Sequence, residues 1–179
     1  QHLVSDKRWA ALSIDLNKIR VYNETYGDLA GDQLIKALGA ILTDIADENE
    51  FVGHIEADDF LMTTAPQDAE RKAERICQQF DSISTRFYPK GDLERGYLIS
   101  TGRGGIRRRI PLISIAIGIV DSTKRRFHSY VDVLTAARDA RYLAKEKVES
   151  CWVVDDPQKS RNDDRDLLES DEENQEMAS

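Results

Sequence analysis

The residues from Leu112 to Val120 (LISIAIGIV) form an unbroken apolar stretch rich in β-branched side chains. Such a stretch is typical of a strand buried on both faces, because a strand with one face in water alternates apolar and polar residues. A strand of this kind needs a packed layer on each side of its sheet. The stretch therefore predicts a sheet that is covered by helices.

Other periodic segments predict the elements around this strand. Apolar residues that recur every three or four positions predict helices over 18–26, 32–47, 66–84 and 130–148. Short apolar runs predict strands over 9–15 and 151–154 and a β-hairpin over 51–64. The glycine-rich segment around 87–110 predicts an extra β-ribbon. The predicted fold class is α/β, an α+β sandwich in which helices cover a mixed sheet.

Length and composition limit the class of protein. A chain of 179 residues suits one domain, and 40% hydrophobic with 32% charged residues is typical of a globular domain in water. No apolar run approaches the roughly 20 residues of a membrane span, and no signal peptide is visible. The two cysteines, Cys77 and Cys151, lack the spacing of a zinc site. We expect a cytoplasmic domain with no membrane span.

The net charge of -8 is concentrated at one end of the chain. Residues 155–179 hold ten acidic and three basic residues and almost no β-branched or aromatic ones. Such a segment buries too little apolar surface to offset its ordering entropy, so we predict a disordered acidic tail after a domain at 1–154. The nearly neutral remainder argues against nucleic acid as a partner. Arginines at 103 and 107–109 are either a solvated face of the ribbon or a docking site.

Acidic residues come together where two predicted strands end. Asp15 closes the first strand, and Asp58 and Asp59 lie in the turn of the hairpin. If these strands are neighbours, the carboxylates meet at one edge of the sheet and can hold Mg²⁺ against a triphosphate. A nucleotidyl-transfer site has this geometry. Turn formation is the ordinary alternative for Asp58 and Asp59.

The same residues belong to a longer pattern. Asp15, Asn23, Gly27, Gly31 and Asp32 have the spacing of the opening motif of GGDEF domains, the diguanylate cyclases, which the chain resembles from about residue 10 to 154. Glu56-Ala57-Asp58-Asp59-Phe60 occupies the place of the signature hairpin. The resemblance implies the GGDEF, or nucleotidyl cyclase-like, fold with a central five-stranded sheet.

The resemblance also implies roles for individual residues. Asp15 and Asp58, with the backbone carbonyl of Leu16, would be ligands of Mg²⁺, the cofactor expected if the site is retained. Asn23 and Asp32 would bind guanine, Asp59 would orient the attacking 3′-hydroxyl, and Lys145 would meet the triphosphate. Helix capping by Asn23 and Asp32 and a solvated Lys145 are the structural alternatives.

Several positions depart from the family pattern. Glu56 and Ala57 replace two glycines that let the turn approach phosphates, and Glu56 adds a negative charge there. Glu149 stands where an arginine is expected near the phosphates. The inhibitory site of the family would fall at 47–50, which contains no arginine to grip a cyclic dinucleotide, so we predict no inhibitory site.

These departures predict a degenerate GGDEF signalling domain of cyclic di-GMP pathways, catalytically impaired and regulatory. Two alternatives stay open: an active diguanylate cyclase that condenses two GTP molecules, and a GTP sensor without turnover. GTP and a second copy of the domain are the candidate partners. We also expect an upstream sensor or receiver domain in the full-length protein.

Overall fold

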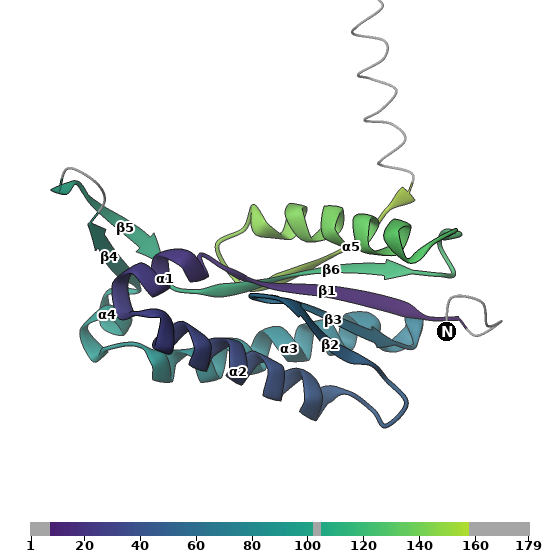
Figure 1. Cartoon of the computed structure of the whole chain (residues 1–179), viewed down its shortest axis with the longest axis horizontal. Coiled ribbons are helices and arrows are strands. Elements are labelled where there is room, and N and C mark those ends of the chain that lie inside the picture. The colour runs from purple at the N-terminus through teal and green to yellow at the C-terminus, as the bar shows by residue number, and fades with distance from the viewer. Residues whose placement is uncertain (1–7, 102–104, 158–179) are drawn as a thin grey trace, which may run out of the picture.

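The computed structural model describes residues 8–101 and 105–157 and contains two sheets with helices around them (Figure 1). The main elements, in chain order, are β1 (Ala10–Asn17), α1 (Ile19–Tyr26), α2 (Asp28–Ile45), β2 (Val52–Glu56), β3 (Asp59–Thr64), α3 (Ala69–Ser84), α4 (Lys90–Arg95), β4 (Tyr97–Thr101), β5 (Arg107–Pro111), β6 (Ser114–Asp121), α5 (Tyr130–Lys145) and β7 (Cys151–Val154). Apart from α4, this order agrees with the one that the sequence predicts.

The larger sheet has five strands in the order β2-β3-β1-β6-β7. Neighbouring strands are antiparallel except β6 and β7, which are parallel, so the sheet is mixed as predicted. β1 pairs with β6 over its whole length and with β3 on its other side. The apolar stretch from Leu112 indeed supplies an inner strand, although the strand begins at Ser114.

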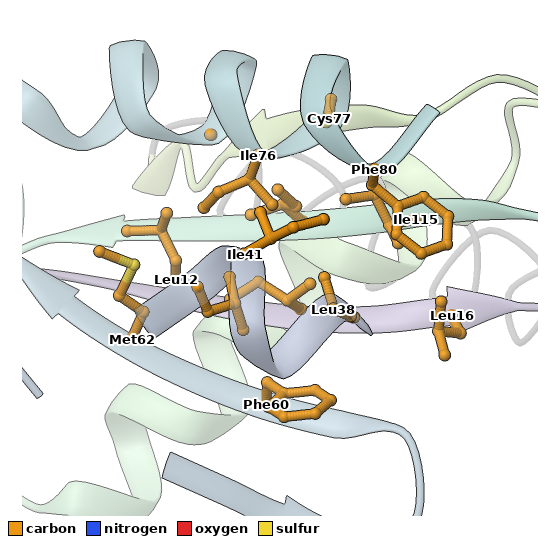
Figure 2. Close-up of a cluster of buried hydrophobic side chains, with 14 of the residues drawn as sticks. Leu12, Leu16, Leu38, Ile41, Phe60, Met62, Ile76, Cys77, Phe80 and Ile115 are labelled. Carbon is orange, nitrogen blue, oxygen red and sulfur yellow. The ribbon is translucent and has the colours of Figure 1, made fainter. Parts of the chain in front are cut away.

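Helices cover both faces of this sheet, with α2 and α3 on one face and α5 on the other (Figure 1). The larger core lies under α2 and α3, where Leu12 and Leu16 of β1 meet Leu38, Ile76 and other apolar side chains (Figure 2). Burying a side chain of this size stabilises the fold by about 1.5–3 kcal/mol. This face therefore carries most of the apolar packing of the domain.

The face under α5 is packed by smaller residues. Its cluster contains Ala11, Val120, Val133, Ala136 and Ala137. Small side chains let a helix approach a strand closely. α5 begins with a capping box in which Ser129 Oγ accepts a hydrogen bond from the backbone N–H of Asp132, and the Asp132 carboxylate accepts one from the Ser129 N–H.

The predicted ribbon is present, and a helix that the sequence did not predict precedes it. The smaller sheet pairs β4 with β5 and projects from one end of the domain (Figure 1). Before it, residues 90–95 form α4, which follows Pro89 and ends at Gly96 with φ 73°. A glycine at this position accommodates the left-handed conformation that closes the helix.

The last helix is shorter than predicted, and the fold reaches slightly beyond residue 154. α5 ends at Lys145, so Val148 lies after the helix and is exposed. The backbone N–H of Asp155 donates to the carbonyl of Ile119 (2.7 Å), and its carboxylate pairs with Arg125 (3.0 Å). Residues 158–179 of the predicted acidic tail lie outside the described residues. Within 8–101 and 105–157, no helix combines the length and apolarity of a membrane span.

Candidate functional site

The alternation of side chains along the strands places two predicted site residues on the face under α5. Leu12, Ile14 and Leu16 point into the core under α2 and α3, so Asp15 points to the opposite face. Ile14 pairs with Phe60 across β1 and β3, which sets Asp59 beside Asp15. The predicted meeting of Asp15 with the hairpin at one edge of the sheet is therefore present in the fold.

Two cations from α5 lie against these carboxylates. Arg141 Nη1 lies 3.6 Å from Asp15 Oδ2 and forms an ion pair with Asp59. Lys145 Nζ lies 2.7 Å from Asp15 Oδ1. The two cations are four residues apart and so share one side of the helix. Lys145 was predicted as a phosphate contact, whereas Arg141 was missed although its spacing from Lys145 pointed to the same side.

Gly118 of β6 brings α5 close enough for these contacts. A Cβ atom at this position would lie 1.9 Å from the carbonyl oxygen of Ala137 and 2.4 Å from the backbone nitrogen of Arg141. The backbone of the helix therefore rests directly on the strand at a position that only glycine permits. This contact fixes the position of the Arg141 backbone relative to β6, and with it the point from which the Arg141 side chain extends.

Burial dominates the electrostatics of Asp15. The residue is 6% exposed, and loss of hydration raises the pKa of its carboxyl to about 6, against the lowering effects of Lys145 and Arg141. The charge of Asp58, half-buried in the hairpin turn, raises that pKa further. Asp15 thus depends on its two cations to stay ionised in a neutral solution.

The hairpin turn carries side chains where the family pattern has glycines. Ala57 has φ 49°, a left-handed conformation that strains a residue with a Cβ. His54 Nε2 lies 2.6 Å from the carbonyl of Ala57, and its ring stacks on Phe60 with 4.5 Å between centroids. Glu56 is exposed beside this turn. The turn is therefore held by contacts of its own side chains.

The residues predicted to bind guanine lie on α1 and α2. Asn23 Oδ1 is buried and has no hydrogen-bond partner among the residues that the structure describes. It faces Gly31, where a Cβ would lie 1.8 Å away, so a side chain at this position of α2 would force the amide of Asn23 to move. Asp32 is exposed on the next position of α2. Leu16 is buried and pairs with Ile115 of β6 in the sheet.

The segment that corresponds to the inhibitory site has a structural role. Lys72 of α3 is 2% exposed and forms ion pairs with Asp47 (2.8 Å) and Glu50. Its ammonium also donates to the carbonyl of Ile45 (3.3 Å). Interaction with Lys72 lowers the pKa of Asp47 below its usual range. These acids therefore anchor the loop between α2 and β2 to α3.

Comparison with known proteins decides the family. The family described as "Diguanylate cyclase, GGDEF domain" matches residues 1–106, more than half of the chain. The chain belongs to the GGDEF family. The comparison with curated proteins finds no match. As a GGDEF domain the chain belongs to cyclic di-GMP signalling.

Solved structures show the same fold. The GGDEF domain of TpbB, also called YfiN, from Pseudomonas aeruginosa is 20% identical with a TM-score of 0.64, covering 87% of this chain and 81% of that one. The GGDEF domain of DgcB from Caulobacter crescentus, solved in complex with c-di-GMP, is 18% identical, with a TM-score of 0.60 and coverage of 82% and 77%. The active GGEEF domain of a diguanylate cyclase from Vibrio cholerae is 17% identical, with a TM-score of 0.59 and coverage of 84% of each chain. The predicted GGDEF fold is thereby confirmed.

Mg²⁺ is typical of the GGDEF family, but the residues of this site do not fit it as they are arranged. Both carboxylate oxygens of Asp15 face a protein cation, and Asp59 is paired with Arg141. Across residues 8–101 and 105–157, no three His, Cys, Asp or Glu side chains are grouped as a metal site requires. A divalent ion at Asp15 would have to displace Lys145 or Arg141.

Proposed function

We propose that this GGDEF domain is a regulatory module of cyclic di-GMP signalling that does not turn GTP over. The observation that carries the proposal is the signature hairpin, in which Glu56 and a strained Ala57 occupy the turn that would have to approach phosphates. A carboxylate there repels a triphosphate, and a Cβ holds the backbone N–H groups away from it.

The pairing of Asp59 supports the same proposal. A residue that orients an attacking hydroxyl needs a free carboxylate oxygen within hydrogen-bond reach of that hydroxyl. Asp59 is instead bound to Arg141, and Lys145 is bound to Asp15 rather than directed at a phosphate. Asp59 and Lys145, two of the side chains for which the family pattern gives chemical roles, are thus used to hold the fold together.

The proposal also includes the location of the domain and its partners. We place it in the cytoplasm, where GTP and cyclic di-GMP are found, and the free thiols of Cys77 and Cys151 suit a reducing compartment. A second copy of the chain and an upstream sensor or receiver domain are its proposed partners. A regulatory domain passes a signal between such partners through changes in contact and not through a product.

Calorimetric titration of GTP with Mg²⁺ into the protein tests the proposal, together with a cyclase assay on a dimer forced by a fused coiled coil. The fused dimer matters because an isolated monomer would lack activity for want of a partner. We expect no cyclic di-GMP. Synthesis of cyclic di-GMP that is lost in Asp59→Ala would overturn the proposal in favour of an active cyclase.

Reverting Glu56 and Glu149 to the residues of the family pattern tests whether these two departures weaken GTP binding. The double variant E56G/E149R restores the glycine of the hairpin and the arginine expected near the phosphates. We expect it to bind GTP at least about tenfold more tightly than the natural chain. The double variant E48G/E146R changes the same residue types at two exposed positions and serves as the matched control. Equal GTP affinity in the two double variants would contradict the role given to Glu56 and Glu149.

A further inference from the structure

Arg141 is a buried cation that lies between the first strand and the signature hairpin. Its side chain is 5% exposed, and its guanidinium contacts Asp15 and Asp59. A guanidinium stays protonated at every pH at which proteins fold. Its positive charge is therefore a permanent part of the site.

Lys145 completes the set of cations around Asp15. Its ammonium contacts Oδ1, while Arg141 contacts Oδ2, so each oxygen of this carboxylate faces a protein cation. A divalent ion bound at Asp15 would need at least one of these oxygens. Displacing Arg141 would leave a buried charge without a partner, which is strongly unfavourable.

The charges of the site nearly cancel without any bound ion. Asp15, Asp58 and Asp59 supply three negative charges, and Arg141 with Lys145 supplies two positive charges. Removal of Arg141 would leave an excess of two negative charges, the charge that one divalent ion neutralises. Arg141 also bridges two carboxylates of the site, Asp15 of β1 and Asp59 of β3.

We propose that Arg141, which bridges Asp15 and Asp59, takes the place of the divalent cation expected at Asp15, so that the domain keeps its signature hairpin closed on the sheet without metal. The inference rests on the proposed function, because a domain that turned GTP over would need the metal that Arg141 replaces. Gly118 is needed for this arrangement, because it lets the backbone of Arg141 pack directly on β6. With Arg141 in place of a metal ion, the site has a structural role instead of a metal-dependent one.

The test is a titration of the full chain with Mn²⁺ in the absence of nucleotide, with free Mn²⁺ measured by electron paramagnetic resonance. For the natural chain we expect no binding tighter than about millimolar. In R141L we expect binding at least about tenfold tighter, competed by Mg²⁺ and lost in D15N/R141L. The matched control is R138L, an exposed position of the same helix, which should behave like the natural chain.

Two results would overturn the inference: micromolar binding by the natural chain that is lost in D15N, or affinity in R141L no tighter than in R138L. If R141L does not fold, R141Q serves in its place. The titration of the natural chain tests the inference even if neither variant folds. Mn²⁺ should also raise the melting temperature of the Arg141 variant but not that of the natural chain.

The outcomes separate this inference from the proposed function. Cyclic di-GMP synthesis by a chain that binds no Mn²⁺ alone would overturn the proposed function and would restrict the role of Arg141 to the nucleotide-free domain. Tight, Asp15-dependent Mn²⁺ binding by a chain without cyclase activity would overturn the role of Arg141 only.

Discussion

Replacement of Gly118 by alanine tests how closely α5 packs on β6. The added Cβ would lie 1.9 Å from the carbonyl oxygen of Ala137 and 2.4 Å from the backbone nitrogen of Arg141. Both are backbone atoms, so no change of rotamer relieves the overlap. Because such atoms normally stand about 3.5 Å apart, the helix has to move by on the order of 1.5 Å.

This movement affects stability in two ways. Overpacking in a well-packed interior costs about 1–3 kcal/mol. The shift also draws Arg141 away from Asp15 and Asp59, and the disruption of a buried ion pair costs about 3–5 kcal/mol when it is complete. We expect G118A to lower the free energy of unfolding by roughly 3 kcal/mol, a large part of the 5–15 kcal/mol typical of a domain.

Urea unfolding followed by circular dichroism measures the effect. Gly39 provides the control, because a Cβ at this position of α2 would lie 3.5 Å from the ring of Phe60, an ordinary contact. G39A should be neutral or stabilising by up to about 1 kcal/mol, since alanine favours a helix more than glycine does. If G118A unfolds within about 0.5 kcal/mol of the natural chain, the close packing described here and the placement of Arg141 that depends on it are wrong.

Three further predictions concern the hairpin and the anchored loop. Ala57→Gly should raise the free energy of unfolding by about 1 kcal/mol in urea, because glycine adopts φ 49° without strain; a loss of stability would argue against the left-handed turn. Lys72→Met should lower it by about 2–3 kcal/mol, because Glu50 loses its buried partner, whereas the exposed Lys36→Met should change it by less than about 0.5 kcal/mol. The pKa of Asp47 is lowered by Lys72, so its contribution to stability is present above the unfolded pKa and is lost as the pH falls through the lower, folded value. Thermal melts from pH 5 downward should therefore show a shallower loss of stability in Lys72→Met than in the natural chain; equal slopes would contradict this linkage.

Most of the fold could be predicted because its elements have clear periodicity. The final strand, Cys151–Val154, was placed at its observed bounds, and the unbroken apolar stretch indicated an inner strand of a covered sheet. α4 could not be predicted, because residues 90–95 have no apolar repeat. Its position depends on contacts far along the chain, among them the hydrogen bond from Tyr26 Oη to Asp92 Oδ2 (2.5 Å).

The site was predictable only in part, for a physical reason. The proximity of Asp15 to the hairpin follows from strand order, which the sequence pattern indicates. The position of Arg141 does not, because an arginine in a helix of mixed charge looks like a solvated residue. Its burial depends on Gly118, 23 positions earlier, and on Asp15 and Asp59 in two other strands. These residues come together only in the folded chain.

The ion pairs of Arg141 join parts of the chain that are synthesised far apart in time. Asp59 and Arg141 are separated by 82 residues, and Asp15 lies earlier still. Without α5, Asp15 and Asp59 would stand side by side on the paired strands as like charges that repel each other. Contacts of such long range carry the entropic cost of closing the loop between them. α5 therefore supplies the charge that stabilises the paired β1 and β3, and a nascent chain cut short before Arg141 lacks that counter-charge.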